Sequence, residues 1–149
     1  DFVPLSEELE QLALYLELEK ERFGGQFNYR IIQHEAVDAE SILLPPMILQ
    51  PFVENAIWHG LRYRKDGGEL TVALSPGGEA VTITDNGIGR DRSLALKTSN
   101  QRKHRSTGLA TTHKRLELMN SHYATHYAVR IEDAYPEEEH VGTRVEINW

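Results

Sequence analysis

The segment Asp85-Asn86-Gly87-Ile88-Gly89 places a carboxylate beside two spaced glycines, at the end of a predicted strand. Glycine has no Cβ, so the backbone at such a segment can approach a flat ligand closely. The Asp85 carboxylate can accept a hydrogen bond from an exocyclic amine such as N6 of adenine, whereas guanine presents an acceptor at that edge. The segment therefore indicates an adenine site, and a simple Asn-Gly turn is the alternative interpretation.

A second candidate site lies in the apolar segment 45–60, where Asn55 and His59 are four residues apart. Residues at this spacing share one face of a helix. An amide oxygen is a suitable ligand for Mg²⁺, which takes few protein ligands and fills its other positions with phosphate and water. His59 can donate a hydrogen bond to a phosphate. A buried, hydrogen-bonded asparagine and a surface histidine are the alternative.

Three further features are candidates for ligand binding, and two of them favour an anion. Residues 106–109, Ser-Thr-Gly-Leu, are predicted to open a helix, whose first N–H groups suit a phosphate. Thr143 in the last predicted strand can hydrogen-bond a base or hold a water beside Asp85, although threonine is also common in strands. The segment 90–105 is basic, which fits a small anion or, alternatively, a solvated loop; its cations are Arg90, Arg92, Lys97, Arg102, Lys103 and Arg105.

The composition limits the class of protein. Of the 149 residues, 40% are hydrophobic and 26% are charged, which fits one globular domain with a substantial core. The net charge of −7 argues against a nucleic acid as partner, because nucleic-acid-binding proteins usually carry a basic surplus. The absence of cysteine excludes disulfides and favours a reducing compartment. The sequence contains no P-loop motif and no apolar stretch of membrane-spanning length. It begins at Asp1 in amphipathic sequence, which predicts a fragment of a longer protein.

Hydrophobic periodicity predicts three helices and several short strands. The leucine stripe of the first segment predicts a helix over residues 5–22, capped by Ser6 and ended by Gly24-Gly25. The other helices are expected over residues 45–60, where Pro51 should bend the helix or delay its start, and over residues 108–120. Strands are expected over residues 26–34, 69–75, 80–85, 127–133 and 141–149.

The order of these elements indicates a fold class. The strands cluster as hairpins, and the helices lie between them without strict βαβ alternation. This order predicts an α+β fold in which the helices pack on one face of a mixed, mostly antiparallel sheet. The helix over residues 1–25 either continues from an upstream segment or packs on its own domain.

Taken together, the segments resemble the GHKL superfamily of Bergerat-fold ATPases, which includes gyrase, MutL and histidine kinases. The residues 51–60 resemble the N box, 85–89 the first glycine box, 106–116 the second glycine box, and 142–147 the closing strand. Within the superfamily, residues 5–24 and 44–56 are most similar to LytS-like sensor histidine kinases. The resemblance covers nearly the whole chain.

This resemblance implies a two-layer α/β sandwich that holds ATP between the N-box helix and a mobile lid over residues 90–107. It implies that Asn55 binds Mg²⁺, with Glu54 as a further candidate, and that Asp85 binds adenine. The remaining implied ATP-binding residues are His59, Gly87, Gly89, Gly108, Leu109 and Thr143. The phosphate-binding candidates of the lid are Arg92, Lys97, Arg102, Lys103 and Arg105.

Three positions depart from the histidine-kinase pattern. Trp58 stands where many histidine kinases have a phosphate-contacting lysine, Ser106 replaces the usual first glycine of the second glycine box, and Thr111 replaces a common asparagine. These departures leave open a degenerate nucleotide-binding module, or pseudokinase. Pro51 favours phosphotransfer, because hydrolytic members carry a water-activating glutamate there and an acceptor imidazole needs no such base.

The resemblance therefore implies a protein histidine kinase that transfers the ATP γ-phosphate to a histidine on an upstream dimerisation segment, and from there to a response regulator. Residues 1–25 would continue from that segment, and residues 26–149 would form the catalytic domain. None of the 7 histidines lies in the acceptor context of the family, so we expect no autophosphorylation by this chain alone. The longer protein is expected to be a homodimer in a bacterial inner membrane, with this domain on the cytoplasmic side. Another GHKL ATPase remains an alternative.

Overall fold

The computed structural model describes residues 2–96 and 99–149, with side chains described for residues 2–96 and 109–149. Its main sheet has the strand order β2-β4-β5-β7-β6. Strand β2 runs parallel to β4, and the other neighbouring pairs are antiparallel. A separate ribbon pairs β1 (Val3–Pro4) with β3 (Leu43–Leu44). The strands of the main sheet are β2 (Phe27–Ile32), β4 (Gly68–Leu74), β5 (Ala80–Asp85), β6 (Ala128–Glu132) and β7 (Thr143–Asn148).

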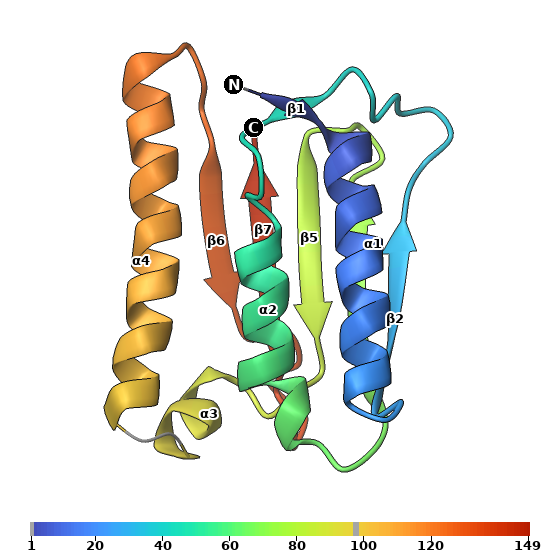
Figure 1. Cartoon of the computed structure of the whole chain (residues 1–149), viewed down its shortest axis with the longest axis vertical. Coiled ribbons are helices and arrows are strands. Elements are labelled where there is room, and N and C mark those ends of the chain that lie inside the picture. Colours follow the sequence, from blue (N-terminus) through green and yellow to red (C-terminus); the bar gives the residue numbers. More distant parts are fainter. Residues whose placement is uncertain (1, 97–98) are drawn as a thin grey trace.

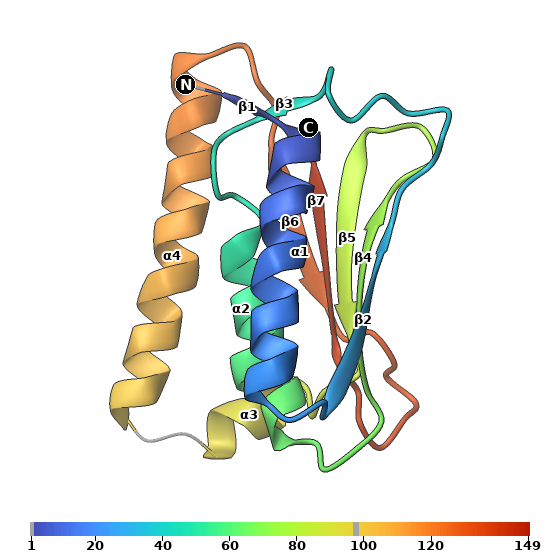
Figure 2. The same cartoon turned by 45° about the vertical axis from the view of Figure 1, so that its right-hand side comes forward.

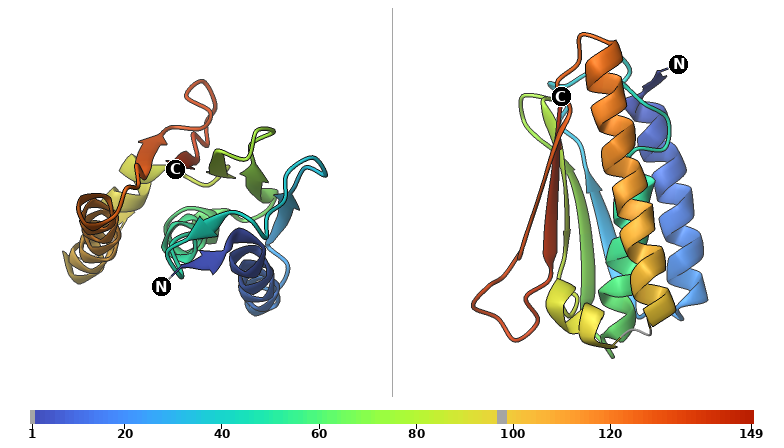
Figure 3. Two further views of the ribbon diagram at one scale, coloured as in Figure 1. Left: turned by 90° about the horizontal axis from the view of Figure 1, so that it is seen from above. Right: turned by 90° about the vertical axis from the view of Figure 1, so that its left-hand side faces the viewer.

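The long helices cover one face of this sheet. Figure 1 shows α1, α2 and α4 side by side in front of the strands, and in Figures 2 and 3 none of the helices that the structure describes lies on the opposite face of the sheet. The predicted two-layer α+β sandwich with a mixed, mostly antiparallel sheet is therefore confirmed. The helices are α1 (Leu5–Arg22), α2 (Gln50–His59), α3 (Arg90–Leu96), α4 (Ser99–His122) and the 3₁₀ turn η1 (Leu61–Tyr63).

The core lies between the two layers and is filled by the periodically spaced apolar residues of the helices and strands. Alternate residues of the central strands point toward the helices, as their alternating burial shows. The leucine stripe of α1 packs into the same cluster, so this helix is part of the domain's own core. Whether α1 continues from an upstream dimerisation segment stays a prediction. The buried core includes Leu5, Leu9, Leu12 and Leu16 of α1, Val72 of β4, Ile83 of β5 and Ile147 of β7.

Two helix starts differ from the prediction. Helix α1 begins at Leu5 after Pro4 and has no side-chain cap, so the predicted Ser6 cap is wrong. The N–H groups of Leu5 and Ser6 donate instead to the carbonyls of Ile42 (2.7 Å) and Ala39 (3.1 Å). Helix α2 begins at Gln50 rather than at residue 45, and Pro51 lies in its first turn, as a proline that delays the start should.

Helix α4 is longer than predicted and changes the interpretation of the second glycine box. It begins at Ser99, so residues 106–109 lie inside a helix and do not open one. The basic segment 90–105, predicted as a loop, contains α3 and the first turns of α4. The physical reason is that one glycine inside a helix costs only about 1 kcal/mol and no proline interrupts residues 99–122. Among the described residues, no helix is long and apolar enough to cross a membrane.

Candidate functional site

Asp85 is positioned by the two-residue period of β5. Val81 and Ile83 are buried in the core, and Asp85 is the next residue on the same side of the strand, with only 3% of its surface exposed. A buried carboxylate is costly unless it is hydrogen-bonded. The backbone N–H of Gly87 donates to Asp85 Oδ1 at 2.8 Å. The carboxylate is therefore fixed at the end of β5, on the face that the helices cover.

Thr143 lies directly beside Asp85 on the neighbouring strand. The antiparallel register of β5 and β7 pairs Asp85 with Thr143 and Ile83 with Val145. Thr143 thus occupies the same inward row as the buried Val145. The sequence suggested Thr143 as a partner of the Asp85 end, and the strand register brings the two residues together.

Helix α2 presents the amide and the imidazole. Its buried positions follow a helical spacing, with Phe52, Val53, Ala56 and Ile57 in the core. Asn55 and His59 are half-buried at the margin of this apolar stripe. Figure 1 shows that the C-terminal end of α2, the end of β5, the start of β7 and α3 meet at one end of the molecule.

These elements enclose one small cavity, here called the α2–β5 pocket. It has a volume of about 10 Å³ in this conformation. That is roughly the volume that one water needs, whereas small-molecule sites usually measure about 300–1,000 Å³. A nucleotide would require its walls to move apart. The pocket is lined by Phe52, Asn55, Ala56, His59, Gly60, Ile83, Asp85, Gly89, Arg90, Thr143 and Val145.

Close backbone contacts hold the pocket together. A Cβ on Gly87 would lie 2.4 Å from the carbonyl carbon of Gly60, so the loop after β5 touches the end of α2 directly. Gly142 has a φ of +60°, and a Cβ there would lie 2.0 Å from the Asp85 carbonyl oxygen. Its N–H donates to the Gly87 carbonyl at 3.1 Å. These positions exclude any side chain, which explains the glycines by steric fit.

Two residues that line the pocket were not assigned to the site from the sequence: Gly60 was named only as the end of the segment that resembles the N box, and Arg90 only as a cation of the basic segment 90–105. Gly60 closes α2 against Asp85, and Arg90 follows Gly89 at the start of α3. Gly60 is required because the end of α2 packs closely against the glycine loop after β5, and a single sequence does not show that these two segments meet. The signal for Arg90 was its position directly after the first glycine box.

Other candidates lie outside this pocket. Glu54 is exposed and accepts a hydrogen bond from Gln50 Nε2 at 3.0 Å. Arg92 is exposed, with its Nη1 3.5 Å from the Glu139 carbonyl oxygen, and Leu109 packs against the hydrophobic core. The side chains of Lys97, Arg102, Lys103 and Arg105, and the surroundings of Gly108, lie outside the described residues.

Trp58 has a structural explanation. Its ring packs against Phe23, with the ring centroids 5.3 Å apart. The guanidinium carbons of Arg22 and Arg62 lie 5.2 Å and 5.6 Å from the Trp58 ring centroid. The contact with Arg22 joins α2 to the C-terminal end of α1, and the contact with Arg62 joins it to η1. The departure from lysine therefore contributes to packing between two helices and lies outside the pocket.

The side chains present fit Mg²⁺ only as part of a nucleotide complex. Among the described residues, no group of three or more His, Cys, Asp or Glu side chains could hold a metal ion. Asn55 offers one amide oxygen in the pocket. Since Mg²⁺ commonly takes one or two protein ligands and completes its shell with phosphates and water, Asn55 matches this mode of binding.

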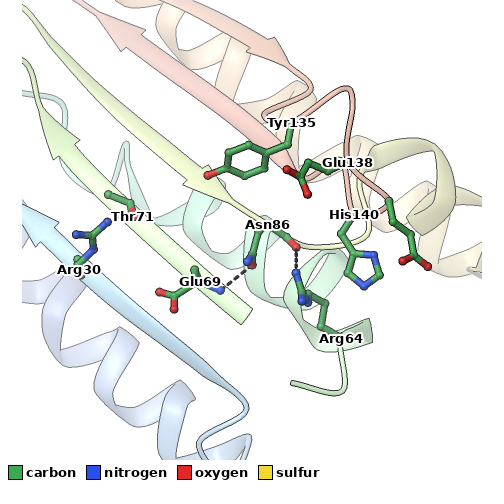
Figure 4. Close-up of a pocket in the computed structure, with 9 residues that line it drawn as sticks. Arg30, Arg64, Glu69, Thr71, Asn86, Tyr135, Glu138 and His140 are labelled. Carbon is green, nitrogen blue, oxygen red and sulfur yellow. Dashed lines mark hydrogen bonds between the residues drawn. The ribbon is translucent and has the colours of Figure 1, made fainter. Parts of the chain in front are cut away.

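A larger hollow lies on the uncovered face of the sheet, with a volume of about 720 Å³. Figure 4 shows Tyr135, Glu138 and His140 on the β6–β7 loop, across from Arg30 and Thr71 of the sheet. This hollow is open and mixes both signs of charge, and it contains neither Asp85 nor Asn55. We therefore place the candidate site in the α2–β5 pocket.

Asn86 is a structural residue at the edge of this outer hollow. Its Oδ1 accepts from the Glu69 N–H at 2.7 Å, and its Nδ2 donates to the Gly67 carbonyl at 3.0 Å. Arg64 Nη1 donates to the Asn86 carbonyl at 2.9 Å (Figure 4). These bonds fix the turn that follows β5 and so hold Asp85 in place.

The sequence is similar to two curated sensor kinases. It is 31% identical over 121 residues to the sensor histidine kinase/phosphatase LytS of Staphylococcus aureus, covering 78% of this chain and 20% of that protein. It is 36% identical over 115 residues to the sensor protein LytS of Oceanobacillus iheyensis, covering 72% and 19%. The chain therefore spans about a fifth of the length of these relatives. No protein-family model matches the chain.

Solved structures share the fold. The mycobacterial sensor histidine kinase MprB matches with a TM-score of 0.61 and 19% identity, covering 99% of this chain and 94% of that one. The cytoplasmic segment of the histidine kinase QseC matches with a TM-score of 0.60 and 17% identity, covering 100% and 76%. A nucleotide-free catalytic domain of the histidine kinase ThkA matches with a TM-score of 0.58 and 10% identity, covering 99% and 94%.

Proposed function

We propose, because the chain belongs to the ATP-binding domains of LytS-like sensor histidine kinases, that it binds Mg-ATP in the α2–β5 pocket and supplies the γ-phosphate to a histidine on another segment. The observation that carries this proposal is the convergence of Asn55, His59, Asp85, Gly89 and Thr143 on one pocket. These residues come from three separate parts of the sequence, and all five were candidates for nucleotide binding.

We propose a task for each polar group of the pocket. The buried Asp85 carboxylate, oriented by the Gly87 N–H, would accept a hydrogen bond from adenine N6. Thr143, its cross-strand neighbour, would support the same edge of the base. Asn55 lies one helical turn before His59 and would hold Mg²⁺, which neutralises phosphate charge when bound. His59 would donate to a phosphate.

The proposed chemistry relies on positioning rather than on a water-activating base. Pro51 lies in the first turn of α2, four residues before Asn55, where hydrolytic relatives have a glutamate. An acceptor imidazole is itself a nucleophile, so the chain needs only to orient and neutralise the phosphate. Slow hydrolysis combined with firm binding is the expected signature.

The wider role is also part of the proposal. The phosphoryl group would pass to an acceptor histidine on a dimerisation segment and then to a response regulator. The longer protein would be a homodimer anchored in a bacterial inner membrane, with this domain on the cytoplasmic side. The names of the curated relatives support a sensor-kinase role, and the pseudokinase alternative loses support because Trp58 has a packing role.

Calorimetry and phosphate chemistry together test the proposal. The chain should bind ATP in the presence of Mg²⁺, hydrolyse it slowly, and form no acid-labile phosphohistidine on its own histidines. Absence of binding at millimolar ATP would favour the pseudokinase. Rapid hydrolysis would favour an ATP-driven clamp, and a stable phosphohistidine on this chain would refute the need for an external acceptor.

A further inference from the structure

Arg90 is the one fully charged cation among the residues that line the α2–β5 pocket in the described structure. It lies at the start of α3, directly after Gly89. Its Nη2 is 3.2 Å from Oδ1 of Asp133, the residue directly after β6. Its Nε is buried and has no hydrogen-bond acceptor among the described residues. The side chain therefore has one partner outside the pocket and one unused donor.

The charges of the pocket create a need for such a cation. Asp85 contributes a carboxylate, while Asn55 and Thr143 are neutral. A nucleotide carries its negative charge on the phosphate chain, and Mg²⁺ offsets only part of it, so a cation in the pocket wall would balance the remaining charge beside the Asp85 carboxylate. The arginine guanidinium matches phosphate through paired hydrogen bonds.

The present partner of Arg90 can be exchanged. The side chains of Arg90 and Asp133 are 38% and 43% exposed, and an ion pair at that exposure is weak. The pocket measures about 10 Å³, so a nucleotide must displace a wall to enter. Arg90 belongs to that wall, and its movement would separate it from Asp133.

We propose that Arg90 is a nucleotide-binding residue that exchanges the Asp133 carboxylate for the phosphate chain of the nucleotide. The Arg90–Asp133 pair then competes with the nucleotide and favours the closed pocket. This inference rests on the proposed function and adds a cation and its competing carboxylate to the same site.

Calorimetric titration of the full chain with Mg-ATP and with adenosine tests this inference. Arg90→Gln should weaken ATP binding about 10-fold or more and change adenosine binding less than about 2-fold, because adenosine lacks phosphates. Arg90→Lys should retain part of the ATP affinity. The matched control is Arg130→Gln, since Arg130 also forms an exposed ion pair, 3.4 Å from Glu146, on the uncovered face of the sheet.

The opposing carboxylate gives an effect of opposite sign. Asp133→Asn should strengthen ATP binding by about 2- to 5-fold, because the competing ion pair is lost. Glu132→Gln removes the same charge one residue away, from a side chain that lies near Arg130 and Arg144, and should have a smaller effect. The double variant Arg90→Gln/Asp133→Asn should bind ATP as Arg90→Gln does.

The outcomes separate this inference from the proposed function. Failure of the unaltered chain to bind ATP would contradict the proposed function itself. If the unaltered chain binds ATP and Arg90→Gln binds it equally well, the inference is overturned. An equal loss of ATP and adenosine binding in a variant with an unchanged melting temperature would place Arg90 on the base and would also overturn it.

Discussion

Replacing Asp85 by asparagine should change which purine the domain recognises. The substitution preserves the shape of the side chain, so an asparagine Oδ1 can still accept from the Gly87 N–H, now 2.8 Å from the Asp85 carboxylate. The second oxygen, however, becomes an NH₂ donor. A donor would then face adenine N6, which is also a donor, whereas guanine O6 is an acceptor.

The magnitude follows from burial. Only 3% of Asp85 is exposed, so water cannot replace a lost partner there. A hydrogen bond to a charged group contributes about 1.5–3 kcal/mol. Since 1.4 kcal/mol corresponds to a factor of ten, ATP affinity should fall by roughly 10- to 150-fold. GTP affinity should not fall, so the preference for ATP over GTP should shrink by a similar factor.

The assay is a pair of calorimetric titrations, with Mg-ATP and Mg-GTP, on the unaltered chain and on Asp85→Asn. Asp66→Asn is the matched control, because it makes the same chemical change at an exposed side chain outside the pocket. Circular dichroism and the melting temperature establish that both variants are folded. A folded Asp85→Asn variant with an unchanged ATP-to-GTP affinity ratio would refute the adenine-binding role.

Three further predictions concern Mg²⁺, the glycine contacts and alkaline stability. Asn55→Ala should weaken ATP binding in Mg²⁺ but not in EDTA, and calorimetry under both conditions would show a constant loss if Asn55 holds no metal. Gly142→Ala should lower the free energy of unfolding by about 2 kcal/mol or more in urea denaturation; Gly25→Ala, whose φ is +77° but whose Cβ would meet nothing within 4 Å, should cost less, and equal costs would contradict the steric argument. Burial raises the pKa of Tyr15 above 10.0, and the nearby Glu19 and Glu54 carboxylates raise it further. Because Tyr15 ionises first in the unfolded chain, its contribution to the free energy of unfolding should be fully present below pH 10.0 and should decrease as the pH rises above that value. Tyr15→Phe should flatten this decrease, and an unchanged slope would contradict the prediction.

The architecture was predictable because the apolar periodicities are strong. The leucine stripe of α1 and the alternation in β5 and β7 both match the buried face of the structure. The same alternation places Asp85 and Thr143 on the inward face, so the sequence alone could predict that these two residues belong to the site. These local patterns need no tertiary information to be recognised.

Element boundaries were less predictable because tertiary contacts decide them. The first N–H groups of α1 donate to the carbonyls of Ala39 and Ile42, which lie more than thirty residues away. The residues around the helix start do not reveal such distant acceptors. The start of α4 at Ser99 was missed because Gly108 resembled a helix opening, although a glycine is tolerated inside a helix.

The composition of the pocket wall was the least predictable feature. The backbones of Gly60 and Gly87 pack closely together although the two residues lie far apart in the sequence. The proposed role of Arg90 depends on its ion pair with Asp133 and on its position in the pocket wall. Both depend on how β5, β7 and the end of α2 converge, which residue types alone do not specify.

A crystal structure of the chain with Mg²⁺ and a non-hydrolysable ATP analogue would show directly where the nucleotide binds. We predict that adenine N6 lies within hydrogen-bond distance of the Asp85 carboxylate and that the Asn55 amide oxygen coordinates the metal. A nucleotide bound in the hollow on the uncovered face of the sheet, or a metal without Asn55 as ligand, would contradict it.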